Sequence, residues 1–154
     1  MYLFAGVSVR GITEYGEEWI MVEKALKRID VEPGIERLEE VTEFVEETFI
    51  ECSVSDKVIM SMNIALDEIF SNITYYSGAK HVVAECGVID GMAVMRLYDD
   101  GKPYDPTKAA EVDITETAEE RKIGGLGIHM VKNMMDELEY AYENGMNILT
   151  MKKR

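Results

Sequence analysis

Residues 58–73 carry an apolar stripe with helical spacing, and this stripe constrains the fold of the chain more than any other feature. Its members recur three and four positions apart over about four turns, which places them on one face of an α-helix. Ser55 precedes the stripe as a favourable N-cap, and Asp56 stands in the first turn, where an acid suits the helix dipole. The stripe consists of Val58, Ile59, Met62, Ala65, Leu66, Ile69, Phe70 and Ile73. The sequence therefore predicts an amphipathic helix that buries this face.

One border of the same helix carries two polar side chains, Glu68 and Asn72, in line with Ser61 and Ala65. Residues four apart lie side by side on a helix, so Glu68 and Asn72 project together at the edge of the core. A carboxylate can accept a proton from a water or a hydroxyl, and the Asn72 oxygen is a hard ligand suited to Mg²⁺, with phosphates and waters completing its shell. Taken alone, such a pair is usually a solvated helix edge.

Two segments precede this helix. Residues 24–31 favour a short strand, which Pro33 and Gly34 close with a turn. Residues 35–50 have helical spacing, with Ile35, Leu38, Val41, Val45 and Phe49 on the apolar face. Most of the other positions of that helix are glutamates, namely Glu36, Glu39, Glu40, Glu43, Glu46 and Glu47. We interpret this acidic set as a solvated face, and a docking surface for a basic partner is the alternative.

Turn signals divide the second half of the chain into two hairpins. Asp90-Gly91 and Asn144-Gly145 are two-residue turns of the kind that joins antiparallel strands. The expected strands are residues 81–86, 92–98, 138–142 and 146–151. Between the hairpins, residues 106–122 are polar and typical of a functional lid, and residues 126–135 favour a helix. This order predicts an α/β fold, a two-layer sandwich with the helices on one face of a mainly antiparallel sheet.

A loop with fixed geometry follows the second expected strand. It reads DDGKPYDP from Asp99 to Pro106, and its glycine and two prolines restrict the backbone. Asp99 at the strand end can accept a hydrogen bond from an exocyclic amine. Read in isolation, the loop is an acidic turn and nothing more.

A glycine-rich segment, Gly124-Gly125-Leu126-Gly127, leads into the last expected helix. Bare backbone N–H groups at the positive end of a helix form a cradle for anions such as phosphates. A flexible hinge is the alternative interpretation. The chain has neither GxxxxGK[ST] nor a GxGxxG after a first strand, so the segment is not a Walker-type or dinucleotide loop.

Composition sets the class of protein. The 154 residues suit one domain, which we expect at residues 23–154, with residues 1–22 as a segment of unknown role. The net charge of −14 argues against binding to nucleic acid or to an anionic membrane. Cys52 and Cys86 form no metal or disulfide pattern, and the apolar opening run is too short to span a membrane, so we expect a cytoplasmic protein. Methionines at core-like spacings, Met60, Met62, Met92, Met95, Met130, Met134 and Met135, predict a pliable core.

Taken in chain order, ExxxN on a helix, DxGxP after a strand and GGLG before a helix resemble the nucleotide-binding motifs of the GHKL ATPase family. Within that family, DDGKPYDP and RKIGGLGIHMVKNMMDELEY are similar to the anti-sigma-factor serine kinases of bacteria. The resemblance runs from about residue 24 to residue 154. It implies the Bergerat fold of these ATPases, with ATP and Mg²⁺ as cofactors.

The resemblance also implies roles for individual residues. Glu68 matches the catalytic base that activates a serine hydroxyl, and Asn72 matches the Mg²⁺ ligand. Asp99 matches the aspartate that binds the adenine amine, and Gly101 matches the glycine that lets the purine approach. The segment Gly124, Gly125, Leu126 and Gly127 matches the phosphate-binding motif, and Arg121 or Lys122 would neutralise phosphate charge from the lid.

Three positions depart from the pattern of the wider family. Pro103 replaces the second glycine of the DxGxG motif, as is usual in the kinase branch. Tyr76 stands where a histidine is common, and Asn147 stands near a position where a threonine often supports the adenine site. These two differences affect the expected contacts of adenine and phosphate.

By resemblance, the chain is expected to be a protein serine/threonine kinase that binds a sigma factor and phosphorylates a STAS-type antagonist, and so regulates transcription. Relatives of this kind are homodimers. A nucleotide-dependent protein-interaction module without phosphotransfer is the alternative, and Glu68 favours the enzyme. A detached ATPase domain of a sensor histidine kinase ranks last, because no helical hairpin with a phospho-accepting histidine precedes residue 68.

Overall fold

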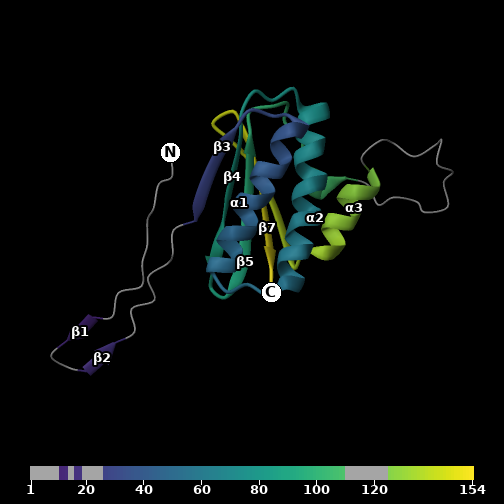
Figure 1. The fold of residues 1–154 in the computed structure, drawn as a ribbon. Helices are drawn as coiled ribbons and strands as arrows, with labels where there is room; N and C mark the ends of the chain where they lie inside the picture. Colours follow the sequence, from purple (N-terminus) through teal and green to yellow (C-terminus); the bar gives the residue numbers. More distant parts are fainter. Residues whose placement is uncertain (1–10, 14–15, 19–25, 110–124) are drawn as a thin grey trace.

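The computed structural model describes residues 11–13, 16–18, 26–109 and 125–154. Within these ranges a five-stranded antiparallel sheet forms one layer, and the helices cover one face of it (Figure 1). The strands lie in the order β3-β4-β5-β7-β6. The two-layer α/β sandwich expected from the order of elements is therefore confirmed.

The elements follow the expected sequence along the chain. The strands of the main sheet are β3 (Lys27–Val31), β4 (Val82–Ile89), β5 (Met92–Asp99), β6 (Glu137–Glu143) and β7 (Met146–Lys153). The helices are α1 (Leu38–Glu51), α2 (Asp56–Asn72) and α3 (Gly125–Met134), with shorter helical turns η1 (Ile35–Arg37), η2 (Ile73–Ser77) and η3 (Pro106–Lys108). A separate two-stranded sheet pairs β1 (Gly11–Thr13) with β2 (Gly16–Glu18). The division of the chain at residues 22 and 23 stays a prediction.

The helix α2 forms the centre of the helical layer, between α1 and α3 (Figure 1). All eight residues of the predicted stripe are buried, and Met62, Leu66 and Phe70 are completely excluded from solvent. They pack with the helix-facing side chains of the sheet, which include Val82, Ala84, Cys86, Met95, Leu97, Leu149 and Met151. Ser55 is the N-cap residue, as expected, although its side chain makes no capping hydrogen bond. The strongest periodic signal in the sequence thus identifies the core.

The first helix differs from its prediction at its start. Residues 35–37 form a 3-10 turn, and α1 proper begins at Leu38. A 3-10 turn has three residues per turn, so it rotates Ile35 away from the buried stripe, and Ile35 is 45% exposed. Phe44 and Thr48 are buried instead, and the Thr48 hydroxyl donates to the Phe44 carbonyl at 2.8 Å.

Both predicted hairpins are confirmed. The two central residues of each turn have left-handed backbone conformation. Asp90 and Gly91 have φ of 50° and 76°, and Asn144 and Gly145 have φ of 52° and 78°. Positive φ at both central residues matches the twist of the flanking strands, which is why Asp-Gly and Asn-Gly are favoured there. Two strands extend further than predicted: β4 continues to Ile89 and β7 continues to Lys153.

Beyond Asn72 the helix widens into the π-helical turn η2, which ends at Gly78 with φ of 70°. Turns of this kind are rare and often occur at functional sites. Tyr75 and Tyr76 point outward from η2, with their rings in an edge-to-face arrangement 6.3 Å apart. The turn also brings Ser77 to the loop that follows β5.

The methionine prediction is correct only in part. Met62, Met92, Met95 and Met135 are buried, and Met134 packs against the core, but Met60 and Met130 are 65% and 40% exposed. Both lie on the outer faces of their helices. In the part of the chain that the structure describes, no helix has the length and apolar character needed to cross a membrane.

Met60 and Met62 give a matched test of the core. Met62→Ala should lower the free energy of unfolding by about 2–5 kcal/mol, because it removes a fully buried side chain and leaves a cavity. Met60→Ala, on the exposed side of the same helix, should change it by less than about 0.5 kcal/mol. Urea denaturation of both variants measures the difference. Equal losses would show that the core is assigned incorrectly.

Candidate functional site

Glu68, on α2, lies directly against Gly127 in the first turn of α3. A Cβ built on Gly127 would overlap the Glu68 carboxylate, so a larger residue there would require the Glu68 side chain to move from its position. The structure therefore brings together the acid of the helix border and the glycine-rich segment. It also places both glycines, Gly125 and Gly127, within the first turn of α3, whereas the sequence predicted that the helix starts at Leu126.

Asn72 and Glu68 are joined by a hydrogen bond across one turn of α2. The Asn72 amide donates from Nδ2 to Glu68 Oε1 at 3.0 Å. Both residues are half-buried, at the border between the core face and the exposed face of the helix. Because the amide donor is directed to Glu68, the side-chain oxygen of Asn72 is the atom left to act as a ligand. Within the described ranges, no residue donates to Glu68 Oε2.

Asp99, at the end of β5, is a buried carboxylate with 5% exposure. Its Oδ1 accepts from the Gly101 amide at 2.9 Å and from Asn147 Nδ2 at 3.0 Å. Burial raises the pKa of Asp99 above its ordinary value, and the donors Asn147 and Gly101 oppose that rise. A buried acceptor is suited to the recognition of a polar ligand atom.

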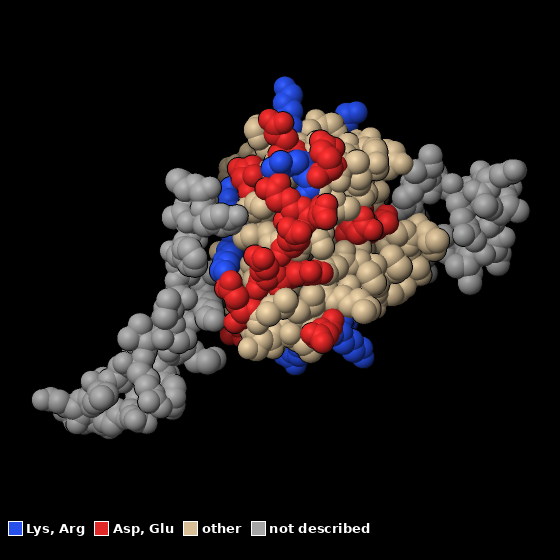
Figure 2. Space-filling model, viewed as in Figure 1, with Lys and Arg blue, Asp and Glu red and all other residues tan. Residues whose placement is uncertain are grey.

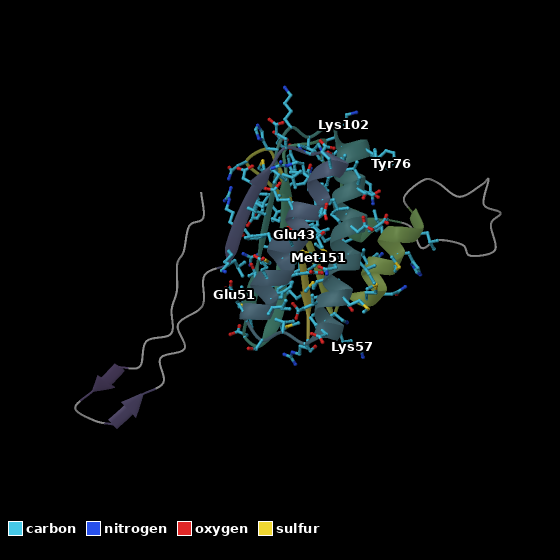
Figure 3. The ribbon with its side chains drawn as sticks, viewed as in Figure 1. Glu43, Glu51, Lys57, Tyr76, Lys102 and Met151 are labelled. Atoms are coloured by element: carbon cyan, nitrogen blue, oxygen red, sulfur yellow. The ribbon has the colours of Figure 1, made fainter. Side chains whose placement is uncertain are left out.

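The loop after β5 packs tightly on the end of the π-helical turn. A Cβ at Gly101 would lie 2.6 Å from Ser77 Cβ and 2.8 Å from Asp99 Oδ1, so this position also excludes a side chain. The Lys102 amide donates to the Ser77 carbonyl at 2.9 Å. Figure 3 shows Tyr76 and Lys102 at the same end of the molecule. Ser77 therefore connects the helix that carries Glu68 with the loop that carries Asp99.

A second aspartate fixes the same loop from outside. Asp100 Oδ1 accepts from the backbone amides of Lys80 and His81 at 2.7 and 2.9 Å. These amides, His81 first, lower the pKa of Asp100 below its ordinary value. Further along, Asp105 accepts from Thr107 at the start of η3, where Pro106 is buried. The predicted lid therefore begins with an anchored turn, and its residues beyond 109 lie outside the described part of the chain.

Several predicted site residues belong to the undescribed segment. Arg121, Lys122 and Gly124 fall there, so their predicted roles stay predictions. Leu126 is 52% exposed at the outer surface of α3. Among the described residues, no three His, Cys, Asp or Glu side chains gather as a metal cluster. Asn72 could hold a cation at this site through its side-chain oxygen.

Two residues of the site have no signal in the sequence. Ser77 contacts Gly101 only because η2 widens the helix end, and Tyr140 reaches Asn147 from the neighbouring strand β6. Asn147 is 5% exposed and bonds to Asp99, and its role at the adenine site stays a prediction.

Comparison with known proteins agrees with this geometry. The sequence model of the histidine kinase-like ATPase domain matches residues 31–153, and the chain belongs to that family. The expected resemblance to the GHKL anti-sigma-factor kinases is thereby confirmed at the level of the family, and nucleotide use follows from it.

The relatives in this family include serine-protein kinases named RsbW. The protein from Bacillus cereus strain AH820 is 28% identical over 102 residues, which are 61% of this chain and 63% of that protein. The Listeria monocytogenes protein is 26% identical over 106 residues, 64% of this chain and 68% of that one. The chain thus spans somewhat less than two thirds of the Bacillus cereus relative.

A solved structure shares the fold. The crystal structure of the RsbU and RsbW domains of a Mycobacterium tuberculosis protein matches 82% of this chain and 32% of that chain, with a TM-score of 0.56 and 15% identity. At this identity the likeness concerns the fold alone.

The two neighbouring aspartates should respond to pH in opposite ways. Asp99 has a raised pKa in the folded state, so stability falls as pH rises through that pKa, and Asp99→Asn should raise the melting temperature at pH 7. This gain should shrink as the pH is lowered and Asp99 in the wild type becomes protonated. The pKa of Asp100 is lowered in the folded state, so the ionised side chain stabilises the fold at any pH above the pKa that Asp100 has in the unfolded chain. Asp100→Asn should therefore lower the melting temperature at pH 7. Thermal melts between pH 4 and pH 7 would contradict this account if both variants shifted in the same direction.

Proposed function

We propose that this chain is an Mg-ATP-dependent protein serine kinase of the anti-sigma-factor type. It binds a sigma factor and phosphorylates a STAS-type antagonist. The observation that carries the proposal is the position of the Glu68 carboxylate, between Asn72 and the glycine-rich start of α3. A proton acceptor, a cation ligand and a set of backbone N–H donors then lie in one place, as phosphoryl transfer requires.

The nucleotide base belongs at the other end of the site. Asp99 offers a carboxylate oxygen in a buried position, where it accepts a hydrogen bond from the adenine amine. Gly101 matches the glycine that lets the purine approach in the family, and its missing side chain makes room here for Ser77 beside Asp99. Ser77, by fixing the loop to the end of α2, holds the base site at a set position relative to Glu68.

The phosphates belong near α3. Its first turn presents backbone amides without intrahelical partners, from Gly125 onward, at the positive end of the helix. Gly124, Arg121 and Lys122 complete this phosphate site in the proposal. Asn72 holds Mg²⁺ through its side-chain oxygen, and the ion, when bound, offsets the negative charge of the phosphates.

The proton of the attacking serine goes to Glu68. Oε1 accepts from Asn72, and none of the described residues donates to Oε2, so we assign to Oε2 the proton of the antagonist's serine hydroxyl. The hydrogen bond from Asn72 also holds the carboxylate in one orientation, which limits the reorganisation needed when the substrate arrives.

The surface is consistent with protein partners of basic character. Exposed glutamates cover the outer side of α1 and the turn before it (Figure 2), and they include Glu36, Glu39, Glu40, Glu43, Glu47 and Glu51. Acidic surfaces attract basic partners and repel nucleic acid. We propose that the protein acts in the cytoplasm as a homodimer, like the anti-sigma-factor kinases that it resembles, and regulates transcription without contacting nucleic acid itself.

Mg-ATP should raise the melting temperature of the protein. A ligand that binds only the folded state stabilises it by RT ln(1 + [L]/Kd), about 2.7 kcal/mol at a hundredfold excess over Kd. Asp99→Asn should remove most of this effect, because an amide presents a donor where the adenine amine needs an acceptor. A melt that millimolar Mg-ATP leaves unchanged would rule out nucleotide binding.

Variants of α2 separate the kinase from the alternative, a nucleotide-dependent interaction module. Glu68→Gln keeps the size of the side chain and removes the proton acceptor. ATP affinity should therefore stay within a few fold, while phosphorylation of a STAS partner should fall by about 10²-fold or more. Asn72→Ala should weaken both, because a cation ligand acts in the ground state as well. Radiolabelled ATP and a purified STAS protein provide the measurement.

Asp67→Asn is the matched control for this experiment. Asp67 is the neighbouring acid on α2, is exposed and bonds only to Ser71 among the described residues. Its variant should keep both ATP affinity and phosphotransfer. If the wild type binds ATP and transfers no phosphate to any STAS partner, the kinase assignment is wrong and the interaction module is the better description.

A further inference from the structure

The outer side of the helical layer carries large apolar side chains that are not part of the core. Ile50 on α1 and Met60 on α2 are 63% and 65% exposed, and Ile64 on α2 and Met130 on α3 are exposed as well. Single exposed apolar residues are common on proteins, whereas a continuous group of them marks a contact surface. These four side chains are therefore informative if they are neighbours.

The contact between α1 and α2 places Ile50 and Met60 side by side. The two helices run antiparallel (Figure 1), and Asn63 Nδ2 donates to Glu46 Oε1 between them. Ile50 follows Glu46 by four residues and Met60 precedes Asn63 by three, so both lie about one turn from that hydrogen bond in the same direction. Ile50 also follows Glu43 by seven residues, which puts both on the outer side of α1.

The contact between α2 and α3 extends the group to Met130. The start of α3 packs on Glu68 through Gly127, and Met134 at its end accepts a hydrogen bond at 2.6 Å from the last residue of β7. That residue lies at the end of the sheet opposite the loop after β5, to which the end of α2 is joined. Helix α3 therefore runs antiparallel to α2, and Ile64 and Met130 lie at the same level, about one turn from the contact with Glu68.

The four side chains form one row across the helical layer, because Met60 and Ile64 are also four residues apart on α2. We call the row Ile50, Met60, Ile64 and Met130 the apolar ridge. In Figure 2, an uncharged area over α2 and α3 borders the acidic side of α1. Methionine is unbranched and adapts to the shape of what it contacts, so a ridge with two methionines suits binding of another molecule.

The acids beside the apolar ridge are not neutralised. Glu39, Glu43 and Glu47 are exposed on α1, and within the described ranges none of them forms an ion pair. Glu40 on the same helix differs, because Arg37 pairs with it at 2.7 Å. Unpaired negative charge next to exposed apolar side chains is complementary to a partner that brings apolar and basic groups together.

We infer that the apolar ridge and these three glutamates form a docking surface for a basic amphipathic helix of a partner protein. Such a helix presents large apolar side chains, three and four positions apart, to the ridge, and its Lys and Arg side chains lie over α1. A second copy of this chain fits less well, because it brings the same unpaired glutamates to the contact. Anionic membranes are repelled for the same reason. The inference goes beyond the proposed function, because neither the nucleotide nor phosphotransfer enters it.

The test uses a labelled synthetic peptide of Leu and Lys, about five turns long, whose leucines fall on one face of a helix. The control peptide has the same composition with its leucines scattered around the helix. Fluorescence anisotropy with the full chain should show the first peptide binding about tenfold more tightly. Met60→Gln and Ile50→Gln should each weaken its binding by about tenfold, because each removes an apolar contact. Tyr142→Gln, at an exposed tyrosine of β6, should leave it unchanged.

A charge variant tests the acidic side of the same surface. Glu43→Gln should weaken binding of the amphipathic peptide by about threefold at low salt and reduce the dependence of its Kd on salt, because salt screens exposed charges. Glu143→Gln removes the same charge from an exposed position on β6 and should change neither quantity.

Equal binding of the two peptides would mean attraction by net charge alone and would overturn the inference, as would equal effects of Met60→Gln and Tyr142→Gln. Conversion of a dimer to a monomer by Met60→Gln, measured by size-exclusion chromatography, would assign the ridge to a second copy and overturn it too. The variants should keep the stabilisation by Mg-ATP that the wild type has. A wild type that binds the peptides in the expected pattern without responding to Mg-ATP would contradict the proposed function and leave the inference standing.

Discussion

Burial of one face of α2 is the constraint on which the rest of the structure depends. Because Met62, Leu66 and Phe70 are enclosed between the sheet and the flanking helices, α2 cannot rotate about its axis without losing core contacts. Its polar border is therefore fixed as firmly as its apolar face. The position of Glu68 beside α3 is a result of core packing, and no separate scaffold is needed to hold it.

The layers of the fold could be predicted because their signals are local. The stripe of α2 repeats over several turns, and Asp90-Gly91 and Asn144-Gly145 adopt a backbone that few other residue pairs accept. The start of α1 could not be predicted in the same way. In the sequence, Ile35 has the spacing of the apolar stripe of α1. The 3-10 turn over residues 35–37 rotates Ile35 away from that stripe. A turn of three residues is too short to show a periodicity of its own in the sequence.

The candidate site was predictable where its residues lie in contiguous motifs. Glu68 with Asn72 and Asp99 with Gly101 are each within five positions of one another, so their spacing carries information. Tyr140 is different. The two-residue turn at Asn144-Gly145 pairs Tyr142 with Asn147, but the register alone does not reveal that a tyrosine two residues away bonds to the amide. That contact depends on twist and packing.

The π-helical turn η2, residues 73–77, depends on the number of its residues, because that number determines where Ser77 lies. Tyr75 and Tyr76 face outward, so other side chains fit at those positions without disturbing the core. Deleting one residue would instead return the turn to ordinary helical phase and rotate Ser77 by about 100°. Ser77 would then leave Gly101, and the two halves of the site would lose their link. Substitutions at the exposed positions Tyr75 and Tyr76 are therefore tolerated, whereas Ile73 is held by the core and Ser77 by Gly101. Insertions and deletions within residues 73–77 would disturb both.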